Sequence, residues 1–212
     1  MSQIDDGYIK YDRKYYIKGE PLDSECFQEI ESWRKKLFAL KLIGEYVPEK
    51  IGFGNLSARK DYSALRQTRS PQFCITGTQT GKYQSLNANH YTRVIDTNIE
   101  KMIVETNGPL EASSESLTHA ALYMADAKIN FIFHIHSTLI WEGMLRDNLN
   151  KTKKEIPYGT VEMANTVLSI GKERTSGSFA MEGHQDGVVI YGDSCSEVGE
   201  KTLELYRRYK SV

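Results

Sequence analysis

Cysteine is scarce in this sequence, and long apolar runs are absent. The 212 residues include three cysteines, Cys26, Cys74 and Cys195, which are widely separated and odd in number. They form no Cys-x-x-Cys pair and no disulfide framework, so we expect a reducing compartment, the cytoplasm. The longest apolar runs, such as residues 129–136, are far too short to cross a bilayer. The first six residues lack the apolar segment of a secretory signal.

An excess of charge is also missing. The formal net charge is −1, so the chain has no general attraction to nucleic acid or to an anionic membrane, and we expect neither as a partner. Any anion must therefore be bound by a local site. The length and the 40% hydrophobic content are those of one globular domain with a sizeable core.

The apolar pattern predicts an α/β domain. Residues 1–22, rich in charge and tyrosine, are predicted to form an N-terminal extension to a single domain over residues 23–212. Helical spacing predicts helices from Asp23 or Ser24 to Gly44 and over residues 115–127, 161–168 and 196–209. Strands are predicted within 51–59 and at 73–76, 91–98, 101–106, 129–137, 179–181 and 188–191, with a polar loop at 60–72. Strands and helices do not alternate regularly, which favours a mixed or mainly antiparallel sheet.

Two histidines share one face of the clearest predicted strand, Phe131-Ile-Phe-His-Ile-His136. Because side chains alternate along a strand, His134 and His136 point the same way, while Phe133 and Ile135 point to the opposite side, which is predicted to be core. Adjacent imidazoles are costly to bury without a partner, and a metal ion satisfies both through ring nitrogens. The alternative is a pair of half-exposed histidines at a strand edge.

A third histidine, His184, lies in a glycine-flanked turn between two late strands. Such a turn can bring a ligand against a distant strand. Three protein ligands leave one position open for substrate, which is typical of a catalytic zinc site. The alternative is a histidine in a surface loop.

Ser113, Ser114 and Glu115 stand at the start of a predicted helix, and His119 follows one turn later on the same face. Serine hydroxyls together with the free N–H groups of a first helical turn can bind an anion. The alternative is ordinary helix capping with a packed histidine.

Two glycine-containing segments, residues 54–57 and 76–82, can offer backbone N–H groups and Asn or Thr side chains to phosphate oxygens. Neither is a P-loop, because no Gly-Lys-Ser/Thr ending is present. Each alone is equally compatible with an ordinary turn.

Six motifs occur in a fixed order that resembles the class II aldolase/adducin family, which includes fuculose-1-phosphate aldolase, over residues 24–209. The motifs are Gly54-Asn-Leu-Ser-Ala-Arg59; Ile75-Thr76 with Thr80-Gly81; Ser113-Ser-Glu115 with His119 and Tyr123; His134-x-His136; Pro157-Tyr-Gly-Thr160 with Glu162; and His184 before Gly187-Val-Val189 and Gly192.

The resemblance implies a three-layer α/β/α fold with a central, mainly antiparallel sheet. It implies a homotetramer, with the N-terminal extension and the C-terminal helix as candidate subunit contacts. The implied activity is that of a zinc-dependent lyase, an aldolase that cleaves a phosphorylated ketose through a metal-stabilised enediolate. Such a donor set also accepts Mn²⁺, Co²⁺ or Fe²⁺.

The resemblance also assigns residues by position. The metal ligands are His134, His136, His184 and Glu115, and Glu115 is also the general acid/base. The phosphate-binding positions are Asn55, Thr80, Gly81, Ser113 and Ser114. Tyr206 and Tyr209 are candidate proton donors, because family members often use a tyrosine near the C-terminus or from a neighbouring subunit.

Three departures from the family pattern indicate a divergent subfamily. Ala112 replaces the usual proline, two extra residues follow His184 before Gly187, and the loop at 76–81 is altered and lengthened. Three alternatives therefore stay open: a sugar-phosphate dehydratase, a 4-epimerase, or a non-catalytic adducin-like scaffold. Epimerases of the family tend to carry Asp at the position of Glu115, which favours an aldolase or a dehydratase.

Overall fold

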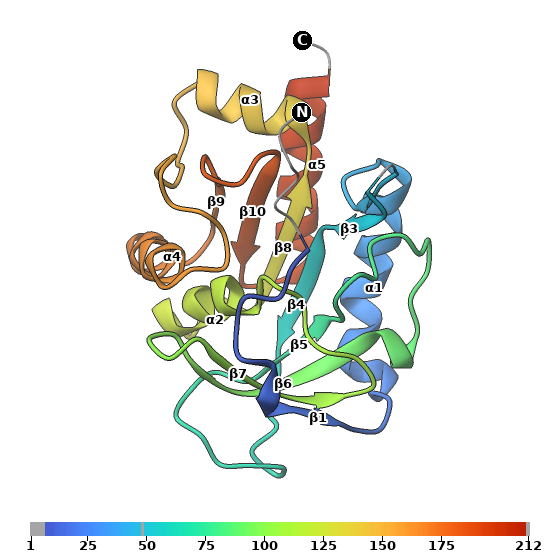
Figure 1. The fold of residues 1–212 in the computed structure, drawn as a ribbon. Coiled ribbons are helices and arrows are strands. Elements are labelled where there is room, and N and C mark those ends of the chain that lie inside the picture. The colour runs from blue at the N-terminus through green and yellow to red at the C-terminus, as the bar shows by residue number, and fades with distance from the viewer. Residues whose placement is uncertain (1–6, 48, 211–212) are drawn as a thin grey trace.

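An eight-stranded sheet forms the middle layer of the molecule (Figure 1). The computed structural model describes residues 7–47 and 49–210. The strand order is β1-β7-β6-β5-β4-β8-β10-β9, and every neighbouring pair is antiparallel except β1 with β7. The strands are β1 (Tyr16–Lys18), β4 (Asn55–Arg59), β5 (Phe73–Thr76), β6 (Tyr91–Asn98), β7 (Ile103–Gly108), β8 (Phe131–His136), β9 (Gly177–Ala180) and β10 (Gly187–Gly192). A separate hairpin pairs β2 (Gly44–Tyr46) with β3 (Ile51–Phe53).

Helices cover both faces of the sheet and complete three layers (Figure 1). One face packs against α1 (Ser24–Ala39), α3 (Thr138–Arg146) and α5 (Cys195–Lys210). The other packs against α2 (Ser116–Ala125) and α4 (Val161–Glu173). The predicted α/β/α architecture with a mainly antiparallel sheet is therefore confirmed. Among the described residues, no helix has the length and apolar character needed to span a membrane.

The strand β8 is buried on both sides. Phe133 and Ile135 belong to the core under α1 and α5, as predicted, whereas Ile132 belongs to the core under α2 and α4. On that second face His134 and His136 are only 1% and 4% exposed. The alternative of a half-exposed strand edge is therefore wrong, because β8 lies between β4 and β10 in a sheet that helices cover twice.

Several predicted boundaries need correction. The first helix ends at Ala39 rather than Gly44, since Lys41 adopts a left-handed conformation with φ of 59° and the helix cannot continue. The predicted strand within 51–59 is two strands, broken at Gly54, whose φ is +79°. The helix α3 and the strands β1 and β2 were not predicted. Asp23 occupies the N-cap of α1 but makes no side-chain capping bond.

The described part of the predicted N-terminal extension lies along the sheet and its loops. β1 pairs with β7, and the Tyr11 hydroxyl donates to the Ala112 carbonyl oxygen at 2.8 Å. Arg13 forms an ion pair with Glu111 through two nitrogens. These contacts hold the segment that leads into Ser113 and α2.

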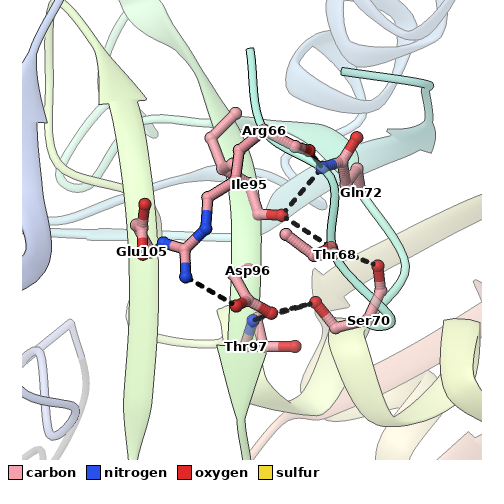
Figure 2. Close-up of polar contacts among 8 residues, drawn as sticks. All are labelled: Arg66, Thr68, Ser70, Gln72, Ile95, Asp96, Thr97 and Glu105. Carbon is pink, nitrogen blue, oxygen red and sulfur yellow. Dashed lines mark hydrogen bonds and ion pairs between the residues drawn. The ribbon is translucent and has the colours of Figure 1, made fainter. Parts of the chain in front are cut away.

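The predicted polar loop at 60–72 is fastened to β6 and β7 where the pairing register shifts (Figure 2). Arg66 forms ion pairs with Glu105 and Asp96, and the Ser70 hydroxyl donates to Asp96 Oδ1 at 2.5 Å. The Gln72 amide nitrogen donates to the Arg66 carbonyl oxygen at 2.9 Å. The loop is therefore ordered by side chains rather than by regular structure.

Candidate metal centre

The sheet register brings three histidines together. His134 on β8 lies opposite Asn55 of β4 on one side and Val189 of β10 on the other. The turn before β10 folds back on itself, because the His184 N–H donates to the Met181 carbonyl oxygen at 2.9 Å. This turn swings the imidazole of residue 184 over β8.

Two glycines make room for the turn. A Cβ on Gly187 would lie 2.6 Å from His184 Cδ2 and 3.2 Å from His134 Nε2. A Cβ on Gly183 would lie 2.1 Å from the carbonyl oxygen of Ile156. Both contacts are too short for any other residue, so the close approach of the histidines depends on glycine here.

The three imidazoles form one buried cluster. One potential ligand nitrogen from each of His134, His136 and His184 lies within 4.8 Å of the others. The ring centroids are 4.9 Å apart for 134–136, 5.4 Å for 134–184 and 4.9 Å for 136–184. None of the three side chains is more than 4% exposed. This is the convergence that a shared metal ion requires.

Burial also sets the charge of the cluster. It lowers the pKa of His184 to about 3, with a smaller contribution from the nearby cation of Lys10. Burial, followed by the neighbouring imidazoles, holds the pKa of His134 and His136 well below the usual range. All three rings are therefore neutral at neutral pH and offer lone pairs rather than charges.

The outer nitrogens of two rings are engaged by neighbouring side chains. His136 Nδ1 lies 2.9 Å from the Tyr46 hydroxyl oxygen, and His134 Nδ1 lies 3.2 Å from the Asn55 amide nitrogen. As placed, the Asn55 amide nitrogen donates to His134 Nδ1; rotating this amide by 180° would instead bring its oxygen, which has no hydrogen-bond partner among the described residues, to accept from Nδ1–H and would leave Nε2 for a metal. Among the described residues, His134 Nε2 is buried without a hydrogen-bond partner. An orphaned buried nitrogen costs about 1–3 kcal/mol, and a cation removes that penalty, so the donor set fits a divalent metal such as zinc.

Glu115 lies outside this cluster of three histidines, at the start of α2. It is 2% exposed and occupies the N-cap position, with no side-chain capping bond. The alternative of ordinary helix capping by Ser113 or Ser114 is therefore wrong, although the Ser113 hydroxyl does accept the Glu115 N–H at 3.3 Å. The two serines instead face a pocket.

One small pocket gathers all the predicted phosphate-binding positions. It has an empty volume of about 330 Å³, and His134 and His136 form part of its wall. The predicted residues that line it are Asn55, Thr80, Gly81, Ser113 and Ser114. Segments far apart in the sequence therefore meet beside the histidine cluster.

Arg34 holds the loop of this pocket, a role that the sequence analysis missed. Its guanidinium is buried in α1 and donates to the carbonyl oxygens of Thr80 at 3.1 Å, Gly81 at 3.4 Å and Tyr83 at 2.6 Å. Burial lowers the pKa of Arg34, while the carboxylate of Glu31 acts in the opposite direction. A charged residue within the apolar stripe of a helix was the available sequence signal.

A second pocket meets the first at His136 and Phe53. It has an empty volume of about 770 Å³ and is also lined by Tyr46, Asp186 and Tyr206. Of the two tyrosines predicted as proton donors, Tyr206 therefore lies in a pocket that reaches the cluster.

The other predicted tyrosine, Tyr209, lies elsewhere. Its hydroxyl donates to Asp147 Oδ2 at 2.9 Å, and its ring packs against Gly143 of α3. Among the described residues of this chain it lines neither pocket.

A buried network fixes α2 beneath the site. Ser57 Oγ lies 2.7 Å from His119 Nδ1 and 2.7 Å from the Tyr123 hydroxyl. Arg59 donates to the carbonyl oxygens of Tyr123 and Asp126 at the end of the helix. His119 is fully buried, and burial holds its pKa well below the usual range. The network therefore anchors the helix that begins at Glu115.

Comparisons with solved structures agree with this fold. YgbL from Escherichia coli is 17% identical, with a TM-score of 0.65 over 89% of this chain and 88% of that one. A sugar-phosphate aldolase from Thermotoga maritima is 15% identical, with a TM-score of 0.63 over 88% and 92%. An L-fuculose-1-phosphate aldolase from Thermus thermophilus is 17% identical, with a TM-score of 0.57 over 90% and 98%.

The sequence itself gives the family. A comparison with curated proteins found no match. The family model described as "Class II Aldolase and Adducin N-terminal domain" matches residues 39–205, which include every histidine of the cluster and both pockets' main loops. The chain therefore belongs to the class II aldolase and adducin family.

Proposed function

We propose that this protein is a zinc-dependent aldolase that cleaves a phosphorylated ketose. The observation that carries the proposal is the buried cluster of three neutral imidazoles at the wall of a pocket lined by hydroxyl and amide groups. A sugar phosphate has both parts that such a site can bind, an oxygen-rich reacting end and a dianionic tail.

The smaller pocket is the proposed site for the phosphate tail. The hydroxyls of Ser113 and Ser114, the Asn55 amide and the backbone of Gly81 offer donors without adding a fixed positive charge. Binding the phosphate there would orient the carbonyl end of the ketose toward the histidines, and this positioning accounts for a large part of catalysis in such enzymes.

His134, His136 and His184 would hold the cation through Nε2 or an equivalent ring nitrogen. A divalent cation bound there supplies Lewis-acid polarisation of the ketose carbonyl. The chain's own contribution is a water-poor, neutral donor set, since burial keeps all three rings unprotonated.

Glu115 is the proposed general acid/base. Its carboxylate is buried at the N-terminus of α2, directly after the two serines of the pocket. We assign to it the transfer of a proton from and to the substrate hydroxyl, while Tyr206 in the second pocket is the proposed donor to the opposite fragment.

Two features favour an aldolase over the alternatives. The carboxylate at position 115 is Glu rather than the Asp expected of an epimerase. A scaffold has no use for three buried ligand nitrogens, and this chain keeps all three. The sugar-phosphate aldolase of Thermotoga maritima has a similar fold, and it is named for the class of reaction that we propose here.

We further propose a homotetramer in a reducing compartment such as the cytoplasm. Cys26, Cys74 and Cys195 form no disulfide with one another, which is compatible with that compartment. Size-exclusion chromatography with light scattering tests the oligomeric state.

Metal analysis and a substrate screen test the function in sequence. Purified protein is expected to bind one zinc per chain and to gain melting temperature on zinc addition. The zinc-loaded protein is then expected to release dihydroxyacetone phosphate from one or more phosphorylated ketoses. Absence of bound metal would favour the scaffold, while bound metal without cleavage would redirect the assignment to dehydration.

A further inference from the structure

We propose that Tyr46 is a positioning residue of the metal centre, whose hydroxyl fixes the His136 ring so that Nε2 faces the other two imidazoles. The inference rests on the proposed metal centre but not on the identity of the substrate. Tyr46 lies on β2 in the separate hairpin, to which the sequence analysis gave no role. Its hydroxyl oxygen lies 2.9 Å from His136 Nδ1.

Aromatic packing reinforces this hydrogen bond. The Phe53 ring of β3 lies over the His136 imidazole, with centroids 5.4 Å apart and an interplanar angle of 32°. The Tyr46 ring packs on Phe53 at 4.6 Å and meets the imidazole edge-on at 6.1 Å and 71°. The ring of His136 is thus held on one face and at its Nδ1 edge.

The two strands of the hairpin lie close against a neighbouring loop. The Gly52 N–H donates to Gln79 Oε1 at 2.8 Å, and a Cβ on Gly81 would lie 2.3 Å from the Gly44 carbonyl oxygen. The hairpin is therefore docked against the same loop that lines the smaller pocket. Tyr46 meets His136 from a prearranged position.

The chemistry of imidazole explains why the contact between Tyr46 and His136 matters for metal binding. A ring that binds a cation through one nitrogen keeps its proton on the other, and an acceptor at that proton selects the tautomer and fixes the orientation. When Nε2 of His136 binds a cation, the Tyr46 hydroxyl oxygen, 2.9 Å from Nδ1, can accept the hydrogen bond of the Nδ1 proton. The Asn55 atom nearest to His134 Nδ1 is the amide nitrogen, which is a donor rather than an acceptor, and only the tyrosine can be shortened by a single hydroxyl while its ring packing is retained.

The test measures metal affinity without any substrate. Metal-free wild type, Tyr46→Phe and a control, Tyr91→Phe, are titrated with Zn²⁺ against a chromophoric chelator. The control also removes a buried tyrosine hydrogen bond, 2.8 Å to Glu31 Oε2, away from the cluster. Loss of an outer partner of a ligating histidine weakens metal binding by about 10–100-fold, so we expect that loss in Tyr46→Phe and wild-type affinity in Tyr91→Phe.

A second readout follows the hydrogen bond directly. In the Co²⁺-loaded protein, the paramagnetically shifted Nδ1–H signal of His136 is expected to be visible in wild type and to vanish by fast exchange in Tyr46→Phe. Partial unfolding would weaken all the shifted signals together, so the selective loss of one reports the contact itself. Unchanged affinity with a retained signal would overturn the proposal. A wild-type protein that binds neither metal would overturn the metal centre as well.

Discussion

The two halves of the candidate site are built in different ways. The histidine cluster lies on a central strand and a tight turn, where backbone pairing and glycine contacts fix each ring. The smaller pocket takes most of its lining from loops, completed by strand residues such as Asn55 of β4, and side chains from distant elements hold those loops in place. Arg34 of α1 and Tyr11 of the N-terminal segment act on those loops from outside. Ligand geometry is therefore a property of the sheet, whereas pocket shape depends on single buried side chains.

The largest expected effect is on metal binding. His134→Ala removes one of three ligands from the rigid half, so metal affinity should fall by more than about 100-fold, beyond the loss caused by an outer partner. Equilibrium dialysis measures it. The matched control is His90→Ala, since His90 lies in a short helical turn outside the cluster. Wild-type affinity in His134→Ala would show that the cluster is not the metal site.

Glu115→Gln should separate chemistry from metal binding. If the carboxylate transfers the proton, turnover falls by about 10²–10⁴-fold while zinc content stays near that of wild type. Steady-state kinetics on the screened substrate and metal analysis measure the two quantities. A variant that loses its zinc but keeps its turnover would contradict the assigned role.

Arg34→Met tests the loop-built half. Removing the guanidinium leaves several buried carbonyl oxygens unpaired, so the free energy of unfolding should drop by about 2–4 kcal/mol. Urea denaturation measures the drop, and Lys35→Met on the same helix is the control with an exposed side chain. Zinc affinity should change much less than in His134→Ala. If Arg34→Met lost as much zinc affinity as His134→Ala, the two halves of the site would not differ in the way described.

The smallest expected effect is a pH dependence of the metal-free protein. Burial depresses the pKa of His184 to about 3 in the folded chain. In the unfolded chain the same imidazole binds a proton near pH 6.5, where the folded chain does not bind it. The free energy of unfolding should therefore fall as the pH drops from about 6.5 toward 3, by at most about 1.4 kcal/mol per pH unit for this histidine. His184→Gln should reduce that slope in urea denaturation. If the free energy of unfolding of His184→Gln had the same pH dependence as wild type, the imidazole of His184 would be exposed to water rather than buried.

The sequence was informative where chemistry and periodicity coincide. His134 and His136 stood out because strand alternation puts both on one face, and the serines before α2 because hydroxyls precede a helix. Tyr46 and Arg34 were missed because their partners are a ring nitrogen 90 residues away and carbonyl oxygens 46 or more residues away, which leave no local pattern. The helix α3 was missed because its N-cap, Ser137, has an extended backbone and continues the strand pattern.

The place of β8 in the middle of the sheet has a consequence for exchange with solvent. Residues 131–134 are paired with β4 along one edge and the whole strand with β10 along the other, so we expect its amide hydrogens to exchange only when most of the protein unfolds. We therefore expect His134 and His136 to keep their spacing when smaller parts of the protein open. The turn before Gly187 is held by its own backbone hydrogen bonds rather than by a strand on each side, so we expect it to open before β8 does.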